Sequence, residues 1–243
     1  MKRRKSRKIA GILVLILGVI ALTTALITRG EETEHIFTVV LDPGHGGEDG
    51  GAVAADGTVE KNLNLSLSLR LKEMLERDGI RVIMTRTEDS DTDGAVGFHK
   101  KQDLQNRVKT AQESDACLYV SIHINASTSP KDQGFQIWYG SGNPTGREAA
   151  EHLTKAVEEK GICTRIRAIK QVPDTLYIFR TVSIPSLLVE CGFLSNAADL
   201  YRLKREDFQE ALCHALCEGI LGYLSGISSD IMDSSFRIPL CRS

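Results

Sequence analysis

Two histidines and two glutamates lie where a hydrolytic metal site would need them. His45 follows an apolar run and is flanked by glycines that let the backbone turn sharply at a strand end. His123 lies near the end of a second apolar run, Glu190 ends a third, and Glu60 opens a segment of helical period. Two imidazoles and one carboxylate, with water in the fourth position, form a ligand set of catalytic zinc. We therefore predict a zinc ion held by both histidines and one of the glutamates.

The remaining carboxylate has a separate chemical task. It can accept a proton from metal-bound water and later deliver that proton to a leaving nitrogen. Zinc lowers the pKa of its bound water from about 15.7 to about 7, so hydroxide is available near neutral pH. A site of this kind hydrolyses amides or esters.

The residue pattern leaves the roles of the two glutamates open. On spacing alone, Glu60 and Glu190 can exchange the tasks of metal ligand and proton carrier. Glu60 can also be a carboxylate that the helix dipole favours at an N-terminus. Glu190 can instead be half of a buried ion pair with Arg86 or Arg180.

His123 belongs to an alternating segment, residues 117–125, that is typical of a strand. One face carries Leu118, Val120, Ile122 and Ile124, and the other carries Tyr119, Ser121, His123 and Asn125. His123 therefore points away from the aliphatic face, near the carboxyl end of its strand. Open α/β sheets place their ligand crevice at that end, so we expect His45, His123 and Glu190 to converge there.

Strand-like runs alternate with longer helical segments from residue 36 onward. This alternation predicts a single three-layer α/β domain, with a mostly parallel twisted sheet covered by helices on both faces. The predicted strands are residues 36–41, 80–85, 116–125, 134–139 and 186–190, and the predicted helices are 60–78, 101–113, 145–160 and 205–224. Leucines in 60–78 fit both periods, but a length of almost 20 residues favours the helix.

The N-terminus predicts a membrane segment. Residues 1–8 form a basic leader, and residues 9–27 form an apolar run with nothing more polar than threonine. A signal peptide has an apolar core of roughly 7–15 residues and a spanning helix needs roughly 20, so we predict a transmembrane anchor, with a cleaved signal as the alternative. The leader should stay cytoplasmic and the rest of the chain should face outward. We expect a linker at 28–35, the catalytic domain at 36–226 and a tail at 227–243.

Charge and cysteine content limit the kinds of partner and of bound metal that the sequence predicts. The net charge of -2 gives no electrostatic argument for nucleic acid. The six cysteines are predicted to be free, because most lie in apolar segments and none has Cys-x-x-Cys spacing. Residues 88–97 are acidic but lack the terminal glutamate of an EF-hand, which indicates a solvated loop.

Four ordered motifs occur at compatible spacing: VVLDPGHGG at 39–47, EKNLNL at 60–65, SIHINA at 121–126 and PSLLVECGFLSN at 185–196. Together they resemble the zinc-dependent N-acetylmuramoyl-L-alanine amidases, over about residues 37–224. The resemblance implies that His45, Glu60 and His123 bind one zinc ion and that Glu190 is the catalytic glutamate. It also implies the substrate, the amide that joins the lactyl group of N-acetylmuramic acid to L-alanine in peptidoglycan.

Within this family the chain most resembles the germination-specific amidases of endospore-forming bacteria. The similar stretches are residues 82–86 and 103–108, with one membrane segment joined directly to the domain. The few residues between Asn125 and Gly134 leave no space for the autoinhibitory helix of division amidases. The resemblance implies action on spore-cortex peptidoglycan, where muramic-δ-lactam then forms, in the intermembrane space of the developing spore. It also implies an accessory lipoprotein partner.

Cys191 departs from the family pattern, in which a small apolar residue is usual. On a strand it faces opposite Glu190, so we expect it to pack beside the site rather than act as a fourth zinc ligand. Two other functions stay open from the sequence: a general cell-wall autolysin of the same chemistry, and a non-catalytic peptidoglycan-binding module.

Overall fold

A six-stranded mixed sheet forms the middle layer of the structure, a computed structural model that describes residues 37–92, 97 and 99–233. The strand order is β2-β1-β3-β6-β4-β5. The strands are β1 (Thr38–Pro43), β2 (Arg81–Met84), β3 (Leu118–Asn125), β4 (Gln136–Tyr139), β5 (Lys170–Gln171) and β6 (Ser186–Phe193). β1 pairs in parallel with β2 and β3, and β3 pairs in parallel with β6, so their carboxyl ends share one edge. Only β4 runs antiparallel to its neighbour β6 among these pairs. The predicted mostly parallel sheet is confirmed.

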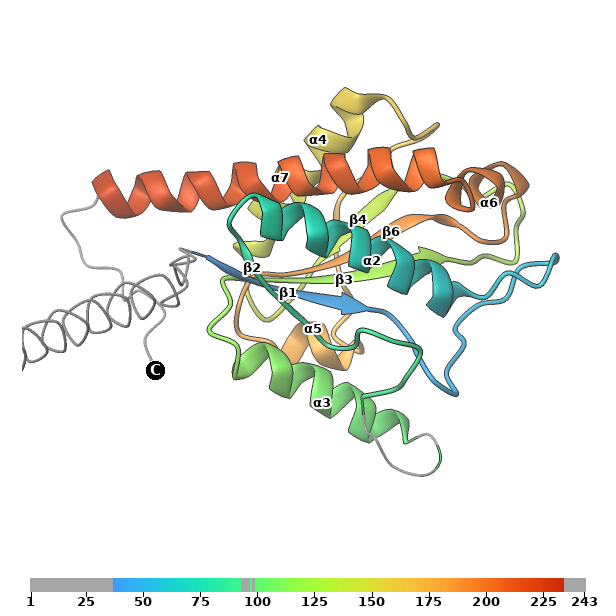
Figure 1. Cartoon of the computed structure of the whole chain (residues 1–243), viewed down its shortest axis with the longest axis horizontal. Helices are drawn as coiled ribbons and strands as arrows, with labels where there is room; N and C mark the ends of the chain where they lie inside the picture. The colour runs from blue at the N-terminus through green and yellow to red at the C-terminus, as the bar shows by residue number, and fades with distance from the viewer. Residues whose placement is uncertain (1–36, 93–96, 98, 234–243) are drawn as a thin grey trace, which may run out of the picture. The chain divides into compact units, whose positions relative to one another are not determined.

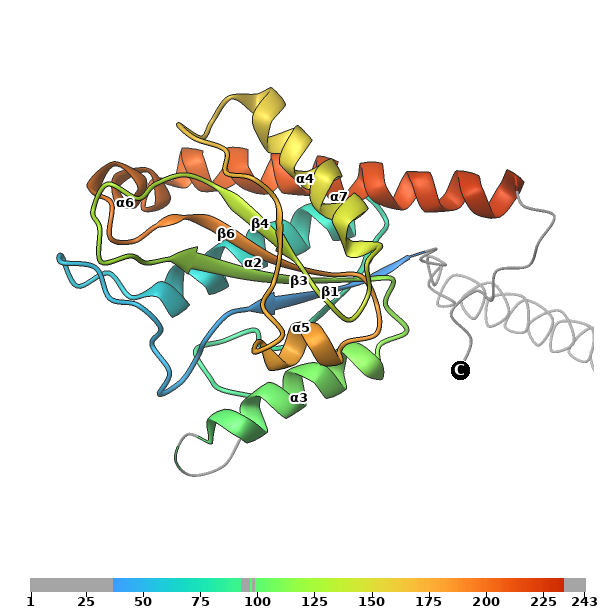
Figure 2. The same ribbon diagram turned by 180° about the vertical axis from the view of Figure 1, so that it is seen from behind.

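Helices cover both faces of the sheet, as predicted (Figures 1 and 2). On one face lie α2 (Glu60–Arg77), α4 (Gly146–Lys160) and α7 (Glu206–Asp233). On the other face lie α3 (Lys100–Gln112) and α5 (Tyr177–Thr181), while α6 (Ala197–Leu203) follows β6. Each face has its own cluster of buried apolar side chains, so the sheet separates two cores.

Residues 60–77 form a helix, which resolves their double periodicity in favour of the longer element. Leu63, Leu67, Leu71 and Leu75 trace its buried stripe against the sheet. Gly79 follows the helix with a φ of 80°, a left-handed conformation that suits glycine and ends the helix. The first residue, Glu60, therefore stands at a fixed helix N-terminus beside the sheet edge.

Three short elements are absent from the sequence prediction: β5, α5 and α6. The last helix is also longer than predicted, because α7 runs past Leu224 to Asp233. The first residues of the segment expected to be a tail thus continue the helix, and Ile227 packs against the core. The predicted basic leader, anchor and linker lie outside the described residues.

Helix α7 contains a stretch, Glu206–Ser228, that is long and apolar enough to cross a membrane by length and composition. Half of its most apolar window is buried in the protein, and the helix packs against α4 and α2. Those contacts identify it as a core helix of the domain. Cys213 and Cys217 on this helix are buried, and both are free thiols, as are Cys163 and Cys191.

Candidate metal and catalytic site

The four predicted residues gather at the carboxyl edge of the parallel strands. His45 follows the end of β1, where Gly44 N donates to Ile122 O of β3 at 3.0 Å. His123 on β3 is directly opposite Glu190 on β6 in the strand register. Residues paired in this way project from the same face of a sheet. The predicted convergence of strand ends is therefore confirmed.

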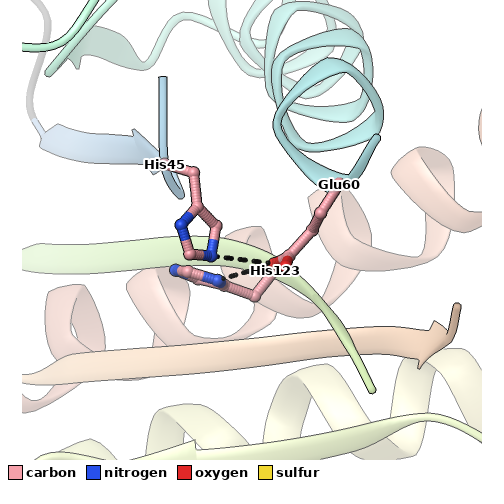
Figure 3. A group of neighbouring side chains, drawn as sticks. All are labelled: His45, Glu60 and His123. Carbon is pink, nitrogen blue, oxygen red and sulfur yellow. Dashed lines mark hydrogen bonds and ion pairs between the residues drawn. The ribbon is translucent and has the colours of Figure 1, made fainter. Parts of the chain in front are cut away.

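Three of these side chains form a compact cluster, drawn in Figure 3. Glu60 Oε1 lies 3.0 Å from His123 Nδ1 and 3.3 Å from His45 Nε2. One ligand atom from each residue falls within 4.8 Å of the other two. The carboxylate is 5% exposed, whereas the imidazoles are 24% and 23% exposed, so the cluster opens toward solvent on the histidine side. Nitrogen and oxygen donors that converge with one side open suit zinc at a catalytic site.

Glu60 is held from several directions. Ala52 N donates to Oε2 at 2.9 Å, and Ile124 N and Asn64 Nδ2 donate to Oε1 at 3.2 and 3.3 Å. Burial alone would raise the pKa of Glu60, but hydrogen bonds with His123 and His45 outweigh it and hold the pKa well below its usual range. The group is thus an anion fixed in place.

Asp49 orients the first imidazole. Its Oδ2 lies 2.9 Å from His45 Nδ1, which leaves Nε2 directed at Glu60. Burial opposes protonation of His45, yet Glu60 and Asp49 raise its pKa above the ordinary value. A carboxylate behind a ligating imidazole is a common arrangement, because it fixes the tautomer and the ring.

A glycine is required where the two histidines meet. A Cβ built at Gly44 would lie 2.2 Å from both Cε1 and Nε2 of His123. His45 itself has a φ of 61°, in the left-handed region that costs a residue with a side chain about 1–2 kcal/mol. The neighbouring Gly46 and Gly47 also have positive φ, so the glycines predicted to allow a sharp turn do so.

Glu190 differs from Glu60 in its surroundings. Its Oε2 is buried and has no hydrogen-bond partner among the described residues. Burial, which outweighs the opposing charge of His123, raises the pKa of Glu190 to about 7. Neither predicted ion-pair partner is bound to it: Arg86 donates to the carbonyls of Pro43 and Gly44, and Arg180 lies over the ring of Tyr177.

A buried ion pair lies beneath the His45 loop. Arg107 Nη1 is 2.6 Å from Asp42 Oδ1, and Arg107 Nη2 donates to His45 O at 2.9 Å. Burial would raise the pKa of Asp42, but the Arg107 charge and a hydrogen bond from Ser121 outweigh it and hold the pKa well below its usual range. The pair therefore ties the loop to the sheet and to α3.

One cavity is lined by residues of the cluster, and a second includes Ala52, whose backbone N donates to Glu60. The first, of about 550 Å³, is lined by His45, His123 and Glu190, with an apolar wall from residues 176–179. The other, of about 420 Å³, is lined by residues 52–55, 126–128, 130, 194, 195, 197 and 200. Both are large enough for part of a ligand. Cys191 lines neither, because its side chain packs in the core on the other face of β6.

Sequence reasoning missed Asp49, Asn64 and Arg107. The position of Asn64 could have been predicted, because residues four apart on a helix share a face and Asn64 follows Glu60 by one turn. Asp49 and Arg107 reach the site through loop geometry and tertiary contacts, which spacing does not reveal.

The sequence profile described as N-acetylmuramoyl-L-alanine amidase matches residues 39–222, which include all four predicted site residues. The chain belongs to this family. It is an amide hydrolase that acts on peptidoglycan. The family match, rather than the cluster of His45, Glu60 and His123 alone, identifies the bond that is cut.

Individual relatives agree with this assignment. The germination-specific N-acetylmuramoyl-L-alanine amidase of Bacillus subtilis is 35% identical over 191 residues, which are 77% of this chain and 79% of that protein. The structure of the CwlD amidase from Clostridioides difficile, solved in complex with the GerS lipoprotein, is 36% identical with a TM-score of 0.71 and covers 78% of this chain and 99% of that one. The amidase AmiC2 of Nostoc punctiforme is 31% identical with a TM-score of 0.68, covering 78% and 98%.

Proposed function

We propose that this amidase is zinc-dependent and that His45, Glu60 and His123 hold the ion, with Glu190 as the proton carrier. The observation that carries the proposal is the convergence of three ligand atoms beside a buried carboxylate oxygen that has no hydrogen-bond partner in the described part of the chain. A bound zinc ion supplies Lewis-acid activation of water and of the scissile carbonyl.

The surroundings of the two glutamates support this division of roles. Both oxygens of Glu60 already accept backbone or amide hydrogens, so its carboxylate is positioned as a ligand and is poorly placed to move a proton. Glu190 Oε2 is free to accept the proton of the attacking water. The same group then returns that proton to the nitrogen of L-alanine as the amide bond breaks.

We further propose that the substrate is spore-cortex peptidoglycan. The support is the similarity to a germination-specific amidase and to an amidase solved with a lipoprotein. On this proposal, removal of stem peptides prepares muramic acid for δ-lactam formation, and a lipoprotein assists the enzyme. Residues 9–27 would anchor the domain in the membrane, with the catalytic domain in the intermembrane space of the developing spore.

The test is digestion of purified cortex peptidoglycan by the full 243-residue protein in detergent, with and without a chelator. We expect mass spectrometry to find released peptides that begin with L-alanine, and zinc to restore the activity after chelation. Activity that survives complete removal of metal would refute zinc dependence.

The biological role needs a separate measurement. Spores of a deletion strain should lack muramic-δ-lactam. Unaltered δ-lactam content, together with retained cleavage of vegetative wall, would favour the general autolysin. A protein that binds glycan, and in which Glu190→Ala changes no measurable activity, would be the peptidoglycan-binding module.

A further inference from the structure

One backbone carbonyl beside the metal cluster is held by two buried side chains from different elements. Gly44 O accepts from Arg86 Nη2 at 3.0 Å and from Asn64 Nδ2 at 3.1 Å. Arg86 follows β2 and Asn64 lies on α2. They are 4% and 0% exposed, so both donors act away from competing water.

Each of these donors also contacts the start of α2. Arg86 Nη2 donates to Lys61 O at 3.0 Å, and Asn64 Nδ2 donates to Glu60 Oε1 at 3.3 Å. Asn64 Nδ2 thus connects Gly44 to Glu60, and Arg86 Nη2 connects Gly44 to Lys61. Because these bonds cross between two segments of the chain, they constrain the separation of two proposed ligands.

Backbone carbonyls satisfy the donors of Arg86. Beyond the carbonyls of Gly44 and Lys61, it donates to Pro43 O and Glu88 O, each at 3.0 Å, and the described residues show no ion pair for it. A buried cation without a carboxylate partner is costly unless its donors are satisfied. A residue needed only for packing could be apolar, so a guanidinium that donates to four carbonyls indicates a task for its fork of donors.

The loop that Arg86 holds has little rigidity of its own. His45 is in the left-handed region, and glycines precede and follow it. Strained or glycine-rich backbone persists only when the surrounding structure determines its conformation. Backbone carbonyls of Pro43, Gly44 and His45 all accept hydrogen bonds from buried arginines. These bonds hold the loop in its conformation.

We infer that Arg86 and Asn64 are positioning residues that set the distance between His45 and Glu60 before the metal ion arrives. Neither touches the reacting atoms. They act by holding Gly44 O and the first turn of α2 together, so the ligands do not have to be ordered by the ion. The inference rests on the metal role proposed above for the cluster.

The test is zinc affinity of the full-length protein in detergent, measured by competition with a chromophoric chelator. Arg86→Lys keeps a positive charge but cannot serve four carbonyls from one planar fork. Asn64→Ala removes the second bridge without removing a charge. Loss of an outer contact of this type weakens metal binding by about 10–100-fold, and we expect that range for each variant. The visible spectrum of the Co²⁺-loaded variants should also change.

Leu153→Ala is the matched control. Leu153 is fully buried in α4, which carries none of the proposed site residues, so its truncation lowers stability without touching the loop. We expect zinc affinity within about 2-fold of wild type at a similar loss of melting temperature. Equal weakening in Leu153→Ala and Arg86→Lys would overturn the inference, as would wild-type affinity in both bridge variants. If Arg86→Lys does not fold, Asn64→Ala decides. A wild-type protein that binds no zinc would instead refute the metal centre itself.

Discussion

Gly44→Ala tests the geometry of the proposed metal site with one added methyl group. The new Cβ would lie 2.2 Å from Cε1 and Nε2 of His123, whereas ordinary contact begins at 3.4 Å. The imidazole or the loop must therefore move by roughly 1 Å, and a displacement of that size costs about 100-fold in rate. Because His123 Nδ1 is 3.0 Å from Glu60 Oε1, the ring cannot move without disturbing the other proposed ligands.

The assay has two readouts: kcat/KM on cortex fragments and zinc affinity of the same preparation. Both should fall by about 100-fold in Gly44→Ala. Gly57→Ala is the control, because it lies in the same β1–α2 connection, has a φ of 86° and has no atom within 4 Å of the added Cβ. That variant loses about 1–2 kcal/mol of stability from backbone strain and keeps its activity. Activity and zinc affinity of Gly44→Ala within about 3-fold of wild type would refute the steric argument.

Three further predictions separate the roles of the carboxylates. Glu190→Gln should lower kcat by about 10²–10⁴-fold while zinc content measured by mass spectrometry stays at the wild-type value; parallel loss of zinc would place Glu190 among the ligands. Glu60→Gln should lose zinc first, and a variant that retains stoichiometric metal would contradict its role as ligand. The third concerns acid stability: Asp42 has a pKa well below its usual value of about 3.9, so its stabilisation is complete above that pH and is lost as the pH falls toward the lower folded pKa. The free energy of unfolding, measured with urea, should fall steeply below about pH 4 in the wild type and less steeply in Asp42→Asn; equal slopes would exclude Asp42 as the source.

The position of the four site residues could be predicted from the sequence because a short rule connects them. Strand ends in a parallel sheet share one edge, so His45, His123 and Glu190 converge once the strands are recognised. The length of the leucine-rich segment placed Glu60 at a helix N-terminus. The same rule gives no information on β5, α5 and α6, which are too short to show a period, or on the direction of β4.

The C-terminal end of α7 could not be predicted from the sequence for a different reason. Glycine and serine after Leu224 weaken the helical pattern, yet the helix continues to Asp233 and Ile227 contacts the core. Tertiary packing outweighs local propensity there.

The partners of Arg86 also depend on tertiary structure. Its charge makes it a candidate ion-pair partner for Glu190, but four backbone carbonyls accept its hydrogen bonds instead.

The two glutamates show why residue type and spacing leave chemistry undecided. Both lie beside the same histidines, but Glu60 starts a helix where backbone donors from Ala52 and Ile124 reach its oxygens. Glu190 lies within a strand whose backbone donors are engaged in the sheet, so its Oε2 has no comparable donor among the described residues. A carboxylate saturated with hydrogen bonds is held in its charged form and keeps its place, whereas one that is buried and unpaired binds a proton more readily. The proposed division into ligand and proton carrier therefore rests on which hydrogen-bond donors surround each carboxylate in the fold, and the order of residues along the chain does not reveal those donors.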